Sequence, residues 1–256
     1  MERNSWLKEY QNKGFTVLPE LFSDDALHGI EHHLSAYLEK IKEGVVFEKD
    51  GQTVRGAHGL HLFDDFFAEL TKNEKILPLA RQALDGDVYV HQFKVNFKQS
   101  YSGKSWPWHQ DYVFWRELDF VPTPNLINIA IFLDDVDYLG GPLWFIPESH
   151  TLGDLSANQL SDQKGESWKD NVAEYLNFQV PADEVSKLSP SKQAVAMTGK
   201  AGDVVLFNPQ LVHCSANNLS DNSRRLLIIT YNQSANLPLK TSSRPDFLCS
   251  PFVESL

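Results

Sequence analysis

A long β-strand is predicted by the run Val88-Tyr89-Val90-His91-Gln92-Phe93-Lys94-Val95-Asn96-Phe97-Lys98, whose side chains alternate with a period of two. One face of this strand is mainly apolar and carries Tyr89, His91, Phe93, Val95 and Phe97. The other face turns polar towards its end and carries Val88, Val90, Gln92, Lys94, Asn96 and Lys98. The run also marks the point at which a mainly helical N-terminal part gives way to strands.

The rest of the chain continues the strand pattern. Segments bounded by Gly, Pro, Asp or Asn predict further strands at 126–133, 143–146, 193–198, 203–207 and 225–231. Many short strands separated by turn residues suit a double-sheet all-β barrel. We therefore predict a mainly β fold with flanking helices, in which a jelly-roll, cupin-like core is wrapped by an N-terminal helical layer.

Helix and turn signals lie around this barrel. Ser23 is a plausible N-cap for a helix over 24–38, and another helix is expected over 63–84. Asp50-Gly51 predicts the turn of a small hairpin. We expect one domain, with the helical layer at about 1–86 and the barrel at about 87–256. An insertion at about 152–190, with a helical middle at 166–176, could cover a site as a lid.

Composition narrows the class of protein. At 256 residues the chain can form one large domain, and 42% hydrophobic with 22% charged residues is ordinary for a soluble protein. No apolar run approaches the roughly 20 residues of a membrane helix, and the start lacks a secretory signal, so the cytoplasm is expected. A net charge of −11 opposes binding to nucleic acids and anionic lipids, which favours a small-molecule partner. Cys214 and Cys249 lack zinc-site spacing and are expected to be free thiols.

Candidate metal ligands are concentrated in Trp106-Pro107-Trp108-His109-Gln110-Asp111 and in His213. Two imidazoles and one carboxylate have the composition of the facial triad that holds non-heme Fe(II), a site that activates O2. Side chains at i and i+2 of an extended segment leave the same face, so His109 and Asp111 can converge while Gln110 points away. The His-x-Asp pair by itself could also be a buried hydrogen-bonded pair. The remaining candidates are disfavoured, because a predicted surface helix or a turn carries His28, His32, His33 and His150.

Three further segments carry a family resemblance. These are Gly14-Phe15-Thr16-Val17-Leu18, Gly140-Gly141-Pro142-Leu143-Trp144-Phe145-Ile146-Pro147-Glu148-Ser149-His150, and the run from His213 through Ser215, Asn217 and Ser220 to Arg224. With the His-x-Asp pair they cover essentially the whole chain. The combination resembles the phytanoyl-CoA dioxygenase superfamily, whose enzymes are Fe(II)- and 2-oxoglutarate-dependent oxygenases on a double-stranded β-helix.

The resemblance implies that the three catalytic metal ligands are His109, Asp111 and His213, which leaves three positions on iron for 2-oxoglutarate and O2. A triad of this kind suits Fe(II), whereas a closed four-ligand site would favour structural zinc. Halogenating relatives replace the carboxylate ligand with a small residue. Because Asp111 is present, the resemblance implies hydroxylation.

The resemblance also implies a cosubstrate site. Arg224 matches the family position that binds the distal C5 carboxylate of 2-oxoglutarate, a role that suits a planar guanidinium fork. Ser215 matches an assisting hydroxyl, and Asn96 resembles a residue that contacts the cosubstrate. Arg225 should point to the opposite side of its strand, so a structural salt bridge is expected there.

Within the family, the segments 53–55, 89–96 and 105–116 resemble ectoine hydroxylase and, more strongly, the leucine 5-hydroxylase of griselimycin biosynthesis. Gln92 and Trp115 match positions that line the substrate pocket of ectoine hydroxylase. A zwitterionic substrate needs a cation for its carboxylate and apolar walls for its carbon chain. The candidates are Arg116 and Arg55 for the carboxylate, and Trp115, Phe114 and Phe207 for the walls, although such aromatics could equally be barrel core.

These implications lead to one main hypothesis. The protein is expected to be an Fe(II)- and 2-oxoglutarate-dependent dioxygenase that hydroxylates an unactivated C–H bond of a free, leucine-like amino acid in specialised biosynthesis. The products would be the hydroxy amino acid, succinate and CO2. The alternatives are a hydroxylase of an ectoine-like or carrier-bound small molecule, and a non-catalytic cupin-like binding module.

Overall fold

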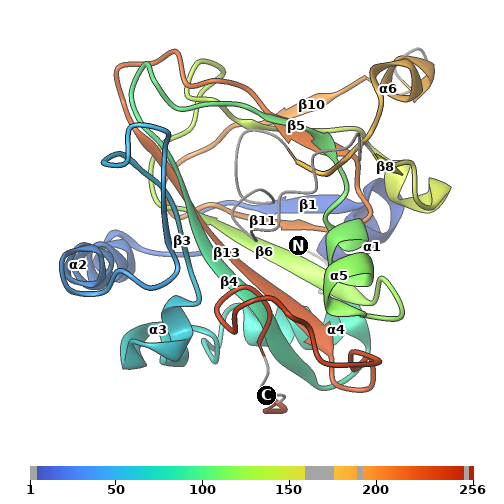
Figure 1. Ribbon diagram of the computed structural model, residues 1–256, viewed down its shortest axis with the longest axis horizontal. Helices are drawn as coiled ribbons and strands as arrows, with labels where there is room; N and C mark the ends of the chain where they lie inside the picture. Colours follow the sequence, from blue (N-terminus) through green and yellow to red (C-terminus); the bar gives the residue numbers. More distant parts are fainter. Residues whose placement is uncertain (1–4, 159–175, 189–192, 251–253) are drawn as a thin grey trace.

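The computed structural model describes residues 5–158, 176–188, 193–250 and 254–256. Two antiparallel sheets share an apolar interior and form the predicted jelly-roll core (Figure 1). The larger sheet has the strand order β1-β11-β6-β13-β4-β3-β2, and the smaller has the order β10-β7-β12-β5. The larger sheet contains β1 (Phe15–Leu18), β2 (Val45–Phe47), β3 (Val54–His58), β4 (Val88–Lys98), β6 (Leu126–Phe132), β11 (Val204–Phe207) and β13 (Arg224–Gln233). The smaller contains β5 (Trp106–His109), β7 (Leu143–Phe145), β10 (Val195–Met197) and β12 (His213–Ser215).

The helices are α1 (Ser5–Lys13), α2 (Asp24–Lys40), α3 (Asp65–Leu70), α4 (Leu77–Leu84), α5 (Asp111–Asp119) and α6 (Ala182–Leu188). Two short 3-10 helices span Leu60–Leu62 and Ser149–Leu152. The predicted N-cap is confirmed, because the Ser23 side chain accepts a hydrogen bond from the Ala26 backbone N–H. The single helix predicted over 63–84 is wrong. Asp64 caps α3 through the N–H groups of Phe66 and Phe67, and Pro78 lies in the first turn of a separate α4, so the segment contains two helix starts.

The larger sheet separates two apolar layers. Its outer face packs against α2, α3 and α4, where Leu34 and Phe67 meet Phe93 and Ile129. Its inner face meets the smaller sheet in a second cluster that includes Phe132, Phe145 and Phe207. Burying each such side chain stabilises the fold by about 1.5–3 kcal/mol relative to leaving it exposed. The two layers hold the strands that surround the site.

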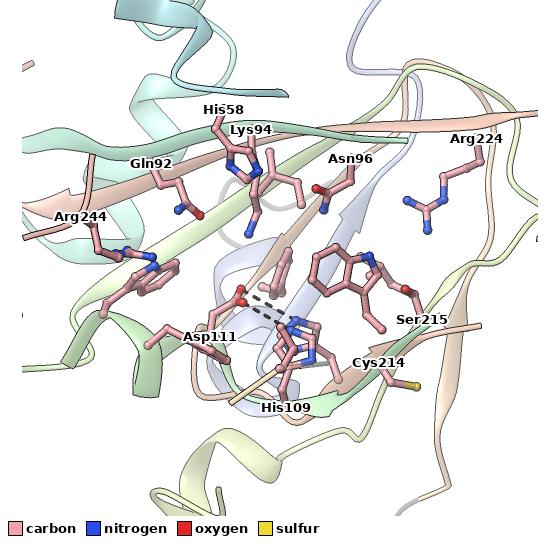
Figure 2. Close-up of a pocket in the computed structure, with 18 residues that line it drawn as sticks. His58, Gln92, Lys94, Asn96, His109, Asp111, Cys214, Ser215, Arg224 and Arg244 are labelled. Atoms are coloured by element: carbon pink, nitrogen blue, oxygen red, sulfur yellow. Dashed lines mark ion pairs between the residues drawn. The ribbon is translucent and has the colours of Figure 1, made fainter. Parts of the chain in front are cut away.

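Strand β4 departs from the strict alternation predicted for it. The register of β4 against β13 shifts between Thr230, which pairs with Gln92, and Tyr231, which pairs with Val90. An extra residue at a β-bulge reverses the faces of the strand on its two sides. Val88 and Val90 therefore join the outer core with Phe93 and Val95. Gln92, Lys94 and Asn96 keep the predicted common face, which points towards the smaller sheet (Figure 2).

The N-terminal part contributes three strands to the barrel and is less purely helical than expected. The hairpin predicted around Asp50-Gly51 is confirmed as β2 and β3, with Gly51 at a φ of 70°. Strand β1, which pairs with β11, was not predicted as a strand. In the insertion, the structure describes β8 (Ala157–Asn158), β9 (Phe178–Gln179) and α6. The predicted helical middle at 166–176 lies almost entirely outside the described residues.

Cys214 and Cys249 are free thiols, as predicted. Among the described residues, no helix combines the length and the apolar character required to cross a membrane.

Candidate active site

Two histidines and one aspartate come together where the smaller sheet meets α5. His109 ends β5 and pairs directly with His213 on β12. Asp111 is the first residue of α5, so the His-x-Asp segment leaves the strand at Gln110, which keeps an extended backbone. Gln110 points away as predicted, because its side chain bonds the backbone of Gly153, Gln210 and Leu155.

The donor atoms of this cluster converge on one point. The Nε2 atom of His109 lies 3.6 Å from Oδ1 of Asp111, and the Nε2 atom of His213 lies 3.8 Å from Oδ2 (Figure 2). The outer Nδ1 atoms lie 2.7 Å and 2.8 Å from the carbonyl oxygens of Pro107 and Leu211. An Nδ1–H donated to a carbonyl leaves Nε2 as the free lone pair, which is the arrangement that orients metal-binding histidines. Sequence reasoning did not name these carbonyl partners.

The Asp111 carboxylate is oriented by a buried chain of hydrogen bonds. Asn128 Nδ2 donates to Asp111 Oδ2 at 2.8 Å, and Thr230 Oγ1 donates to Asn128 Oδ1 at 2.7 Å. Burial opposes ionisation of Asp111, but Lys94, His213 and His109 outweigh it and hold its pKa below the ordinary value. Asp111 is therefore a carboxylate.

The cluster suits a divalent iron ion. Its three donor atoms lie within 4.8 Å of one another, and all three residues are buried. Burial and the neighbouring His109 lower the pKa of His213 to about 3, so its imidazole is neutral and can donate a lone pair. Two imidazoles and one carboxylate match the ligand types of a non-heme Fe(II) site.

A cavity opens above this cluster. Its wall on the larger sheet is formed by Gln92, Lys94 and Asn96 of β4, which alternate along one face. Figure 2 shows Arg224 and Arg244 at opposite sides of the cavity, with Asp111 between them. The cavity thus joins the metal cluster to an arginine on each side.

The end of the cavity near Arg224 has polar groups without partners. Arg224 is 3% exposed, and its Nη2 donates to the Gly141 carbonyl at 2.6 Å. Its Nε and the Ser215 hydroxyl are buried, and neither has a hydrogen-bond partner among the described residues. Unsatisfied buried donors are costly, so these atoms point to an acidic ligand. Asn96 lines the same cavity.

The structure brings four of the six predicted substrate residues to the cavity wall: Gln92, Trp115, Phe114 and Phe207. It does not bring Arg116 there. That side chain lies on the outer face of α5, is 39% exposed and bonds Glu117 and Asp154. Arg55 is buried beneath the wall, where it pairs with Glu48 and stacks over the Trp106 ring at 4.3 Å. Neither guanidinium lines the cavity.

Sequence reasoning missed a cation that the structure brings to the cavity instead. Arg244 lines the wall although it lies in a loop far along the chain. Its Nε donates to Asp119 Oδ1 at 2.7 Å, and its Nη2 bonds the other carboxylate oxygen. Asp119 also accepts from Ser242 Oγ and lies 3.2 Å from His91 Nε2. No motif signalled this role, because it depends on the fold of the C-terminal segment over α5.

Lys94 and His58 complete the same part of the wall. They are direct partners in the register of β3 and β4. Burial, followed by Lys94 and Arg244, lowers the pKa of His58 to about 3, so its ring is neutral. The alternation of β4 indicated the orientation of Lys94, but nothing in the sequence placed His58 beside it. The predicted structural role of Arg225 is confirmed, since it pairs with Asp134 and Glu31.

A double-sheet barrel with a His-Asp-His cluster under a cavity, and a buried arginine at one end, defines the class of 2-oxoglutarate-dependent non-heme iron dioxygenases. The chain belongs to the phytanoyl-CoA dioxygenase (PhyH) family, whose sequence profile matches residues 10–226.

Curated relatives support this assignment. The chain is 38% identical to an L-proline trans-4-hydroxylase from Streptomyces griseoviridis, over 94% of this chain and 90% of the relative. It is 28% identical to an ectoine dioxygenase from Halomonas elongata, over 94% of this chain and 74% of that one. Among solved structures, EctD from S. alaskensis with bound Fe has a TM-score of 0.80 at 23% identity, covering 97% of this chain and 83% of EctD. At this level of sequence identity, the structural likeness shows a shared fold. The protein is a dioxygenase related to hydroxylases of amino acids.

Proposed function

We propose that the protein hydroxylates an unactivated C–H bond of a free aliphatic amino acid, with 2-oxoglutarate as cosubstrate, and that residues 1–256 act as one oxygenase domain. One observation carries the proposal. The same cavity is lined by the cluster of His109, Asp111 and His213 and by two arginines, which lie on opposite sides of that cluster. One arginine suits the cosubstrate and the other suits the substrate. The reaction would consume O2 and yield the hydroxy amino acid, succinate and CO2.

In this proposal the Fe(II) ligands are His109, Asp111 and His213. The carbonyls of Pro107 and Leu211 hold the two imidazoles with Nε2 inward. Iron bound there supplies the oxidant for C–H hydroxylation when it meets 2-oxoglutarate and O2. The protein keeps the Asp111 carboxylate ionised, keeps the His213 imidazole neutral and fixes all three donors before the metal arrives. Such orientation by neighbouring groups raises metal affinity.

The proposed cosubstrate site lies at Arg224. The guanidinium would bind the distal carboxylate of 2-oxoglutarate, with the Ser215 hydroxyl donating to the same group. This assignment satisfies the partnerless Arg224 Nε and Ser215 Oγ atoms. Asn96 lies on β4, the strand next to the one that carries Arg224, and would contact the cosubstrate nearer to the metal.

The proposed substrate site lies between Arg244 and the metal cluster. Arg244 would bind the substrate carboxylate, because Asp119 neutralises and fixes the guanidinium without removing it from the cavity. Lys94 on β4 adds a second positive charge to the wall of the cavity. The walls predicted for the carbon chain, Phe114, Trp115 and Phe207, all line the cavity. These walls exclude water from the carbon that is to be oxidised.

Two amino acids are the leading substrates. L-Proline is favoured by the likeness to the L-proline trans-4-hydroxylase, and a leucine-like amino acid remains our prediction from the sequence. A role in specialised biosynthesis is part of the same proposal. Ectoine is a second candidate class, because the ectoine dioxygenase relatives match more than nine-tenths of the chain.

A substrate screen tests the proposal. Purified protein with Fe(II), ascorbate and 2-oxoglutarate would be given L-proline, L-leucine, ectoine or no substrate, with succinate and product mass measured. We expect succinate and a product 16 mass units heavier, as for insertion of one oxygen atom, with one amino acid. Activity on ectoine alone would replace the amino acid with the second class. No binding of Fe(II) and 2-oxoglutarate at all would favour a non-catalytic module instead.

A further inference from the structure

Two buried basic side chains lie side by side behind the cosubstrate end of the cavity. Lys98 on β4 and Arg224 on β13 are direct partners in the antiparallel register. They are 2% and 3% exposed. Like charges directly opposite each other on neighbouring strands are destabilising. Neither forms an ion pair with a carboxylate anywhere in the part of the chain that the structure describes.

Both basic side chains donate hydrogen bonds to backbone carbonyls. Lys98 Nζ donates to the Lys104 carbonyl at 2.8 Å and also to the Ala216 carbonyl. Arg224 donates to the Gly141 carbonyl. Lys104 comes shortly before β5, Ala216 directly follows β12, and Gly141 comes shortly before β7. The two side chains thus contact the loops that adjoin β5, β7 and β12 of the smaller sheet. Of these strands, β5 and β12 carry the proposed histidine ligands of iron.

The surroundings of Lys98 are short of negative charge. Burial, followed by Arg224 and Arg55, lowers its pKa to about 6, and this outweighs the opposing influence of Cys214 and Glu48. Glu48 is already paired with Arg55. Burial lowers the pKa of Arg224 to about 10, against the weaker influence of Asp134. At neutral pH the free protein therefore holds one charge here, on Arg224, and the Lys98 amine is largely neutral.

We propose that Lys98 is the second cation of the cosubstrate site: a positioning residue that takes up a proton when a dicarboxylate places its distal carboxylate at Arg224. The carboxylate supplies the negative charge that the pair lacks. One N–H bond forms at Lys98 Nζ, and the proton comes from the buffer. The charged amine then binds the Lys104 and Ala216 carbonyls more strongly and fixes the two loops. The inference rests on the proposed binding of 2-oxoglutarate.

Calorimetry can count this proton. 2-Oxoglutarate is titrated into the anaerobic Fe(II) protein at pH 7.5 in phosphate, Hepes and Tris, whose ionisation enthalpies differ. We expect uptake of about one proton per ligand by the wild-type protein. Lys98→Met should lose the uptake and bind 2-oxoglutarate about tenfold more weakly. 2-Oxobutanoate, which lacks the distal carboxylate, should bind without uptake to both proteins.

Two further variants separate charge from structure. Lys40→Met removes an exposed ammonium at the end of α2, on the outer side of the larger sheet, and should match the wild type in affinity and uptake. Lys98→Gln keeps a hydrogen-bond donor without the titrating charge, so it should remain folded and lose the uptake. Unchanged uptake in a folded Lys98 variant, or equal uptake with 2-oxobutanoate, would overturn the inference. Failure of the wild-type Fe(II) protein to bind 2-oxoglutarate would overturn the proposed function instead.

Discussion

Asn128 Nδ2 donates a hydrogen bond to Asp111 Oδ2 at 2.8 Å, and this contact joins β6 of the larger sheet to the first residue of α5. Asn128 is itself fixed by the Thr230 hydroxyl on β13. The carboxylate that we propose as an iron ligand is therefore held from the opposite sheet, independently of the short strand that carries His109. Rigid support of this kind sets the geometry of a metal site before the metal binds.

Asn128→Ala should weaken metal binding about 10- to 100-fold, because loss of the amide leaves Asp111 free to rotate. The measurement is a titration with Co(II) or anaerobic Fe(II) followed by absorbance or calorimetry. Asn125→Ala is a matched control, since Asn125 lies just before the same strand and bonds Gln233. Wild-type metal affinity in a folded Asn128→Ala protein would contradict the role given to this contact.

The sequence predicted the parts of this site that depend on short-range geometry. The spacing of His109 and Asp111, and the alternation of β4 beyond its bulge, were sufficient to orient those side chains, because both follow from backbone periodicity. Arg244 and Asn128 were missed, because their positions depend on which distant segments the barrel brings together. Arg116 was misplaced for the same reason. Its spacing from Asp111 puts it on the outer face of α5, a helix that the sequence reading had not recognised.

The two arginines near α5 should behave differently on mutation. Arg244→Lys should raise KM for the amino acid substrate about 10-fold or more, because lysine does not reproduce the fork that Asp119 holds. The affinity for 2-oxoglutarate should change little, since Arg224 lies on the other side of the cavity (Figure 2). Arg116→Ala should leave both constants close to wild type. Steady-state kinetics with each ligand varied separately makes the comparison, and a larger effect at Arg116 would restore the sequence-based assignment.

Stability should depend on pH through Lys98. Its pKa falls from 10.5 to about 6 on folding, so between these values the unfolded chain binds a proton that the folded chain does not. The free energy of unfolding of the metal-free protein then rises with pH across this window, by at most about 1.4 kcal/mol per pH unit. Below pH 6, Lys98 adds no pH dependence to this free energy. Urea unfolding at pH 6.5, 7.5 and 8.5 should show a smaller rise for Lys98→Met. Parallel pH profiles would contradict the low pKa.

Gly141 provides a separate test of how the cosubstrate end is assembled. It has a φ of 70°, and an added Cβ would lie 2.9 Å from both the Ala216 carbonyl oxygen and the Lys98 side chain. Gly51 has the same φ of 70°, but a Cβ there would meet nothing within 4 Å. Alanine at either position should cost about 1–3 kcal/mol of backbone strain.

Gly141→Ala should therefore be the less stable of the two variants in urea, because it adds a steric conflict to the same kind of strain. It should also weaken 2-oxoglutarate binding, since the Gly141 carbonyl accepts from Arg224 and would shift with the loop. Gly51→Ala should bind the cosubstrate like the wild type. Equal losses of stability and affinity in both variants would mean that φ alone matters, and that the contact of Gly141 with Lys98 and Ala216 does not position the arginine.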